Sequence, residues 1–128
     1  MTIARINPAS MGGEPASYSN GILCKAPQAT LYVAGQIGID AKGVASPDFE
    51  AQTRQTWANI AAILGEAGMT LQDIVKTTIY LVDRADYATF VKVRTEVLNG
   101  HKPASTLVYV SGLVKPEWKV EIDVIAAR

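Results

Sequence analysis

Apolar residues along the chain change their spacing several times, and each spacing predicts a different element. Residues 2–6, 21–25 and 30–37 are short runs rich in strand-forming residues, separated by turn-forming residues. Residues 7–17, with two prolines and two glycines, predict a long loop. The short link over residues 26–29 predicts a hairpin turn, so the second and third runs are expected to pair as neighbours in a meander.

The next segment has helical spacing. Large or apolar residues recur at intervals of three and four along residues 47–67, at the positions Trp57, Ile60, Leu64 and Ala67. Ser46 is the expected N-cap, because Pro47 after it suits the first helical position. Gly68 is expected to end the helix. One face of this helix should therefore pack on a sheet.

Residues 74–82 form the clearest strand pattern in the chain. Val75, Thr77, Ile79 and Leu81 make up its more apolar face, which should turn toward the helices. A second helix, capped by Asp83 or Asp86, is expected to run to about residue 98, with Phe90, Val93 or Arg94, and Val97 along one side and Gly100 closing it. Strands are then expected after Pro103 and over residues 119–126.

The order of elements is strand, strand, strand, helix, strand, helix, strand, strand. It predicts an α+β fold in which a mixed six-stranded sheet carries two helices on one face, within a single domain over residues 1–128. The other sheet face would carry a mixed set of side chains, which suits a polar interface between copies better than a core: Lys76, Thr78, Tyr80, Glu121 and Asp123. A homo-oligomer is therefore plausible.

Composition supports association with small molecules or with further copies. The formal net charge is zero, so neither nucleic acid nor a membrane surface is an expected partner. Hydrophobic residues make up 48% of the chain, more than a small globule usually hides. No apolar run suits a signal peptide or a membrane span, and Cys24 is alone and is expected to be a small core residue. A cytoplasmic location is the default expectation.

Several familiar catalytic arrangements are missing. With one histidine and one cysteine, a His/Cys metal site within one chain is not expected, nor is any cofactor. The sequence has no Gly-x-Ser-x-Gly elbow, and His101 is best interpreted as an exposed turn residue. Gly12 and Gly13 precede no strand-to-helix step of a phosphate loop.

The segment from Gly100 to Ser111 is the most informative stretch, because it leaves a helix, turns at Pro103 and enters a strand. Its Pro-Ala-Ser-Thr-Leu-Val motif resembles the Pro-x-Arg-Ser/Thr strand entry of the RidA/YjgF family of small trimeric imine and enamine deaminases. Four further segments agree with this family in order: residues 18–22, 31–38, 67–78 and 120–126. The resemblance covers nearly the whole chain.

The resemblance implies a chorismate-mutase-like homotrimer with three clefts between subunits. In each cleft a water would attack a small imine or enamine. Glu121 matches the family glutamate that orients this water, Tyr18 an aromatic lid residue and Gly35 a backbone contact, while the strand entry adds three substrate-binding positions: Ser105, Thr106 and Leu107. A carboxylate in a partly dry cleft suits such proton transfer. The alternative is that Glu121 only pairs with Lys76 or Lys119.

Ser105 departs from the family pattern, since the family has an arginine there that grips a substrate carboxylate. The resemblance therefore points to an arginine-lacking subgroup, and imines derived from amino acids are expected to bind poorly. Lys102 and Lys25 are alternative sources of the lost charge. Val91 stands where the family commonly has asparagine.

Two functions remain open. The first is a deaminase or hydrolase acting on small reactive imines or enamines, with its specificity altered by Ser105. The alternative is a non-catalytic trimer that binds a small ligand or another protein. Ribonuclease activity, sometimes ascribed to the family, has little support, because the chain has zero net charge and no pair of histidines.

Overall fold

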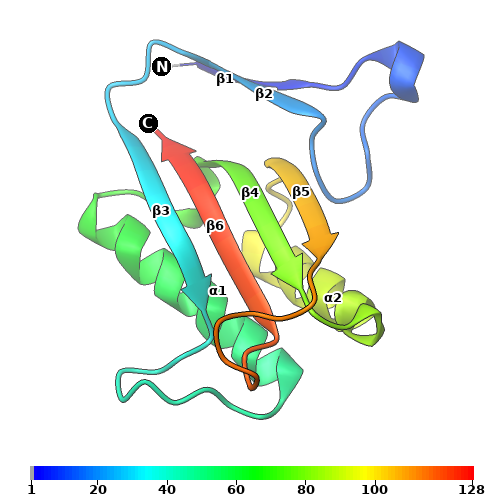
Figure 1. The fold of residues 1–128 in the computed structure, drawn as a ribbon. Helices are drawn as coiled ribbons and strands as arrows, with labels where there is room; N and C mark the ends of the chain where they lie inside the picture. The colour runs from blue at the N-terminus through cyan, green and yellow to red at the C-terminus, as the bar shows by residue number, and fades with distance from the viewer. Residues whose placement is uncertain (1) are drawn as a thin grey trace.

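Four strands form a mixed sheet in the computed structural model, which describes residues 2–128. Their order across the sheet is β3 (Thr30–Ile37), β6 (Val120–Ala127), β4 (Ile74–Leu81) and β5 (Ala104–Tyr109) (Figure 1). β4 and β5 run parallel, whereas β6 is antiparallel to both β3 and β4. The sequence-based prediction of a mixed sheet is confirmed.

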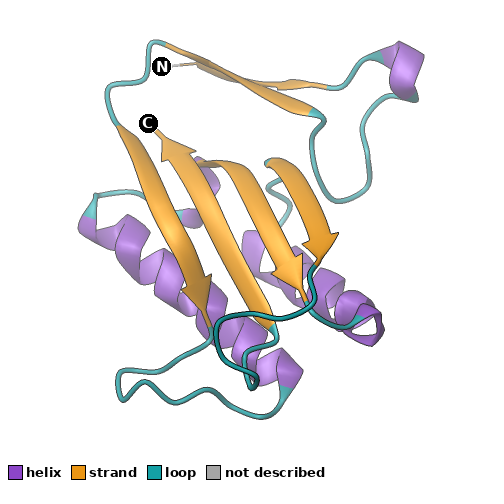
Figure 2. Cartoon of the chain, in the orientation of Figure 1, coloured by secondary structure: helices purple, strands orange, loops and turns teal. Residues whose placement is uncertain are grey.

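Helices α1 (Phe49–Glu66) and α2 (Tyr87–Leu98) cover the same face of this sheet (Figure 2). The predicted alternation in β4 is confirmed for Thr77, Ile79 and Leu81, which are fully buried. It is wrong at the start of the strand, where Ile74 is buried and Val75 is only half-buried, because the register with β6 shifts between Ile74 and Lys76. The core between sheet and helices also includes the large side chains of Trp57, Ile60, Leu64, Phe90 and Ile122. Three short 3₁₀ turns lie between the main elements, at Ala9–Met11, Leu71–Asp73 and Arg84–Asp86. The predicted α+β fold is therefore confirmed.

The predicted single six-stranded sheet is wrong. β1 (Thr2–Ile6) and β2 (Gly21–Lys25) pair only with each other and form a hairpin that stands apart from the four-stranded sheet (Figure 1). The expected meander fails at the link after β2, where the amides of Gln28 and Ala29 both donate to the carbonyl of Arg128. These donors bind the C-terminus instead of closing a turn between β2 and β3.

Cys24 was expected to be a core residue, and this prediction is wrong. It lies in β2, is half-buried and does not belong to the core. The start of α1 also differs from its prediction. Asp48 is the N-cap, and its carboxylate accepts a 2.9 Å hydrogen bond from the amide of Ala51. The Ser46 hydroxyl instead accepts from the amide of Asp48. The predicted end is confirmed, since Gly68 has a left-handed φ of 71°.

Gln52, a fully buried polar residue of α1, connects the helix to the loop before β6. Its side-chain oxygen accepts a 2.7 Å hydrogen bond from the amide of Lys119, and its nitrogen donates to the carbonyls of Ser46 and Glu117. Gly38, just after β3, approaches the backbone of the same helix at this point. The absence of a side chain at Gly38 therefore permits the close contact between sheet and helix.

We expect Gly38→Ala to lower the free energy of unfolding by about 1–3 kcal/mol, as overpacking generally does. The added Cβ would lie 2.1 Å from the carbonyl oxygen of Gln52, which belongs to the helix backbone and cannot simply rotate away. Gly65→Ala is the matched control, because its Cβ meets nothing within 4 Å, and it should stabilise the helix by about 0.5–1 kcal/mol. Urea denaturation measures both changes, and a wild-type midpoint for Gly38→Ala would contradict the close approach.

Candidate functional site

A cavity of about 250 Å³ opens beside β5, between α2 and the loop that precedes β2. Its lining brings together three of the residues expected to contact a substrate, Tyr18, Ser105 and Leu107, with Ser17, Tyr87 and Arg94. The cavity is smaller than the roughly 300–1,000 Å³ typical of pockets for drug-sized ligands. Its size therefore suits a small molecule.

The register of the sheet explains why Ser105 faces this cavity. Ser105 lies opposite Thr77, whose buried side chain points toward the helices, so both belong to the helix-covered face. The Thr77 hydroxyl donates a 2.8 Å hydrogen bond to the Ser105 hydroxyl. Ser105 is thus fixed in position and brings no charge to the cavity.

Tyr18 reaches the same cavity because its loop is attached to the start of β5. The neighbouring Ser19 is buried, its amide donates a 3.0 Å hydrogen bond to the carbonyl of Pro103, and its hydroxyl donates to the carbonyl of Lys102. Tyr18 itself remains 38% exposed. Tyr18 therefore lies at the rim of the cavity, and its role as a lid stays a prediction.

Thr106 does not join the cavity. Side chains alternate along a strand, so Thr106 points to the opposite face from Ser105, where it is exposed. Its hydroxyl accepts a 2.8 Å hydrogen bond from the amine of Lys76. Of the three residues expected at the strand entry, only Ser105 and Leu107 line the pocket.

Glu121 lies on the sheet face that the helices leave uncovered, and Gly35 lies beneath its side chain. The register between β3 and β6 shifts between Val33 and Gln36, which places Gly35 in an irregular part of the strand. A Cβ on Gly35 would lie only 2.3 Å from Oε2 of Glu121. The carboxylate therefore occupies the space that the glycine leaves open, and the two predicted residues meet.

The expected alternative, an ion pair of Glu121 with a lysine, is not found in residues 2–128. Lys76 instead donates to Thr106 and to the carbonyl of Thr77, and Lys119 forms no ion pair with Glu121 in this part of the chain. The half-buried carboxylate of Glu121 is therefore not neutralised by either lysine that the sequence analysis named.

Tyr80 is the cross-strand neighbour of Glu121, and its hydroxyl donates a 3.3 Å hydrogen bond to the carboxylate of Asp123. The charge of Asp123 is the main reason that the pKa of Tyr80 is raised, and burial adds to the effect. A phenol is protonated at neutral pH even without this shift, and the raised pKa extends the range in which it remains a donor to more alkaline pH. Asp123 is thus engaged by a partner on this face.

The two groups of predicted residues lie on opposite faces of one sheet. Glu121 and Gly35 belong to the uncovered face, whereas Tyr18, Ser105 and Leu107 line the cavity on the helix side. One copy of the chain therefore does not bring the carboxylate to the cavity.

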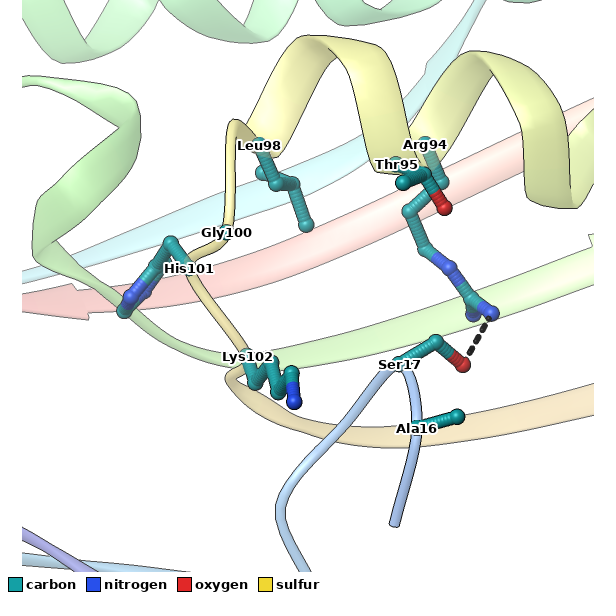
Figure 3. Close-up of a pocket in the computed structure, with 8 residues that line it drawn as sticks. All are labelled: Ala16, Ser17, Arg94, Thr95, Leu98, Gly100, His101 and Lys102. Atoms are coloured by element: carbon teal, nitrogen blue, oxygen red, sulfur yellow. Dashed lines mark hydrogen bonds between the residues drawn. The ribbon is translucent and has the colours of Figure 1, made fainter.

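Arg94 is the cation among the three cavity residues that were not predicted from the sequence, the other two being Ser17 and Tyr87. It lies on the buried side of α2 and is only 5% exposed, yet it lines both this cavity and a smaller one of about 40 Å³ beside it (Figure 3). Its position in the sequence could have identified it, because Phe90, Arg94 and Leu98 are spaced four apart along the apolar stripe of α2. An arginine in such a stripe is unusual.

The two lysines that the sequence analysis considered as replacements for the lost charge do not reach this cavity. Lys102 lines only the smaller cavity, where its amine lies 3.5 Å from the carboxylate of Glu14. Lys25 is exposed at the end of β2. Arg94 is the cation that lies across the cavity from Ser105.

No group of three or more His, Cys, Asp and Glu residues suited to a metal ion occurs within residues 2–128. His101 lies in the turn before β5, but it is half-buried and not exposed as expected, and its Nε2 lies 2.6 Å from the carbonyl oxygen of Ile74. None of the helices in the described part of the chain combines the length and apolar composition that a membrane-spanning segment needs.

Comparisons with known proteins show the family of this chain. Residues 11–128 match the family model described as Endoribonuclease L-PSP. A 2-iminobutanoate/2-iminopropanoate deaminase of Salmonella typhimurium is 39% identical over 102 residues, which span 77% of this chain and 79% of the enzyme.

Solved structures of other proteins resemble the chain over a larger share of its length. The Rid-family protein YyfB from Yersinia pestis has a TM-score of 0.87 and 31% identity, with all of both chains covered. Escherichia coli TdcF, solved with bound serine, has a TM-score of 0.74 and 30% identity, covering 89% of this chain and 90% of its own. The chain therefore belongs to the RidA/YjgF/L-PSP (Rid) family.

Proposed function

We propose that this protein is a deaminase that uses water to convert small reactive imines or enamines into carbonyl compounds and ammonia. The observation that carries the proposal is the carboxylate of Glu121, seated over Gly35 on a sheet face that the chain's own helices leave uncovered. The 2-iminobutanoate/2-iminopropanoate deaminase of Salmonella typhimurium, a relative of this chain, supports the same reaction class.

The proposed chemistry needs only water and one group that transfers protons. Glu121 takes a proton from a water as the water oxygen bonds to the imine carbon, and the C=N electron pair moves to nitrogen. Glu121 gives this proton to the nitrogen, and a carbinolamine with one hydroxyl and one amino group results. Glu121 then takes the hydroxyl proton and passes it to the amino nitrogen, while the C=O bond forms, the C–N bond breaks and ammonia leaves. Glu121 ends as a carboxylate, so the enzyme is unchanged.

The proposed active site is completed by a second copy of the chain in a homotrimer. The uncovered sheet face exposes Tyr32 (75%) and Val108 (40%). The separate hairpin exposes Ile3, Ile6 and Leu23, although a two-stranded hairpin is at best marginally stable alone. A closed ring of copies would cover these surfaces and place Glu121 of one copy against the cavity of the next.

Ser105 is the basis for proposing that this protein is an arginine-lacking member of the family. Its hydroxyl is neutral and already accepts a hydrogen bond from Thr77. The strand therefore offers no cation to a substrate carboxylate, and specificity should differ from that of relatives with arginine at this position.

The same serine favours a second candidate, a trimer that binds a small ligand without catalysis. In this case Glu121 would serve only assembly or binding. The description of the family model also names an endoribonuclease, but the zero net charge and single histidine of this chain do not favour RNA cleavage.

The proposed assembly predicts a mass in solution three times the 13.7 kDa of the chain. Tyr32→Glu should dissociate it, because a charge would be buried at the interface without a partner. Ala62→Glu, on the exposed side of α1, is the control and should leave the mass unchanged. Sedimentation equilibrium at micromolar concentration measures the mass of the wild type and of both variants. A monomeric wild type would rule out a site shared between copies.

Glu121→Gln should lower turnover by about 10²–10⁴-fold, the usual contribution of a general base. The rate is measured as imine loss above the uncatalysed rate, with the imine generated in the assay by an amine-oxidising enzyme. Asp123→Asn is the matched control on the same strand face, since an amide can still accept from Tyr80. Turnover by Glu121→Gln at the wild-type rate would contradict the proposed role. If the wild type shows no turnover and Glu121→Gln binds the ligand with wild-type affinity, the result would favour the non-catalytic binding protein.

Gly35→Ala should also lower turnover, because its methyl group displaces the carboxylate of Glu121. The displacement has a second readout in stability. The cost of Gly35→Ala should shrink when Glu121 is already alanine, with a coupling of about 0.5–3 kcal/mol in a double-mutant cycle. Additive costs in the cycle would show that the glycine does not position the carboxylate.

A further inference from the structure

Arg94 is a buried cation in a position where helices usually bury an apolar side chain. It is 5% exposed on the packed side of α2, with its guanidinium 5.4 Å from the ring centre of Phe90. Burying a charge is costly unless an opposite charge and hydrogen bonds compensate it. An arginine in this position therefore calls for a compensating partner.

The partners that the chain itself supplies are too few. Arg94 donates one hydrogen bond, from Nη2 to the hydroxyl of Ser17 at 3.0 Å (Figure 3). Its Nε is buried and has no partner, and no carboxylate forms an ion pair with it in the described residues. Burial lowers the pKa of Arg94, and the small opposing effect comes from Tyr87. A guanidinium with five donors and one neutral acceptor has room for an anion.

The position of Arg94 indicates which anion this would be. Arg94 and Ser105 line the same cavity, one from α2 and the other from β5, with Tyr18 at the rim. A cation is therefore present in the proposed substrate pocket, although the strand does not supply it. The anion that belongs in this pocket is part of a small substrate.

We propose that Arg94 is the specificity-determining residue that binds a carboxylate of the substrate from the helix side. This inference rests on the proposed deaminase function and names its substrate class as small imino acids. It reverses the expectation drawn from Ser105 alone, that imines derived from amino acids bind poorly. The pocket still contains a positive charge, but helix α2 supplies it and strand β5 does not.

The geometry suits a carboxylate better than a neutral group. A guanidinium presents paired N–H groups that can donate to both oxygens of one carboxylate, and the hydrogen bond to Ser17 uses only one N–H of Nη2. An α-imino acid carries its carboxylate on the carbon that water attacks. Holding the carboxylate therefore also fixes the reacting carbon.

The test compares pyruvate, a stable 2-oxo acid of the product class, with its uncharged amide, pyruvamide, by isothermal titration calorimetry on the assembled protein. Wild type should bind pyruvate roughly 10- to 100-fold more tightly than pyruvamide, the range expected for hydrogen bonds to a charged group. Arg94→Met should abolish the difference. Arg94→Lys should recover part of it, because lysine keeps the charge and loses the fork.

Arg54→Met is the matched control, since it removes an exposed arginine of α1 that pairs with Glu50 and Glu96. It should preserve the preference for pyruvate. Arg94→Met should fold, because replacing a buried charge that lacks a counterion by an apolar side chain is often neutral or stabilising. Its thermal midpoint without ligand should equal or exceed that of the wild type, and added pyruvate should raise the midpoint only in the wild type.

Turnover measured beside binding separates this inference from the proposed function. Binding of pyruvate that depends on Arg94, without turnover of any imine, would refute the deaminase and support the anion site. Turnover with equal affinity for pyruvate and pyruvamide, or an unchanged preference in Arg94→Met, would overturn the inference alone. A loss of assembly mass in Arg94→Met would also overturn it, because the counterion would then belong to a neighbouring copy.

Discussion

The one-sided burial of the four-stranded sheet governs the rest of this structure. Both helices pack on one face, where Thr77, Ile79 and Leu81 are buried, and the chain supplies no cover for the face that carries Glu121. Strand alternation then places neighbouring residues in different environments, so Ser105 enters the cavity while Thr106 faces outward. A site that needs both Glu121 and the cavity must therefore be assembled from more than one copy of the chain.

Local patterns were enough to predict most of the elements. The alternation of β4 and the left-handed Gly68 at the end of α1 follow from side-chain sterics and backbone conformation that act within a few residues. The separation of the hairpin was not predictable in this way. It depends on hydrogen bonds from Gln28 and Ala29 to Arg128, a residue at the opposite end of the chain.

The candidate site was predicted unevenly for the same reason. Tyr18, Ser105 and Leu107 line one cavity, as the family resemblance implied, and Gly35 and Glu121 meet because the glycine leaves space for the carboxylate. A functional role for Arg94 was not predicted, because helical spacing indicates that a residue faces inward but not whether its side chain lies in the core or lines a cavity. Only the neighbouring cavity and the unpaired Nε distinguish it from a core position.

An arginine on helix α2 offers a substrate the same positive charge as an arginine on strand β5 would, but from a different direction. An arginine on β5 would extend toward α2, whereas Arg94 extends from α2 toward the side of the cavity lined by Ser105. The proposed carboxylate would then sit at a different angle to the carbonyl carbon that forms, and the uncharged wall at Ser105 would be left for the rest of the substrate. A buried cation also costs free energy in the empty protein, and bound anion relieves that cost. If substrate binds to Arg94 as proposed, substrate binding and protein stability are coupled through the same guanidinium.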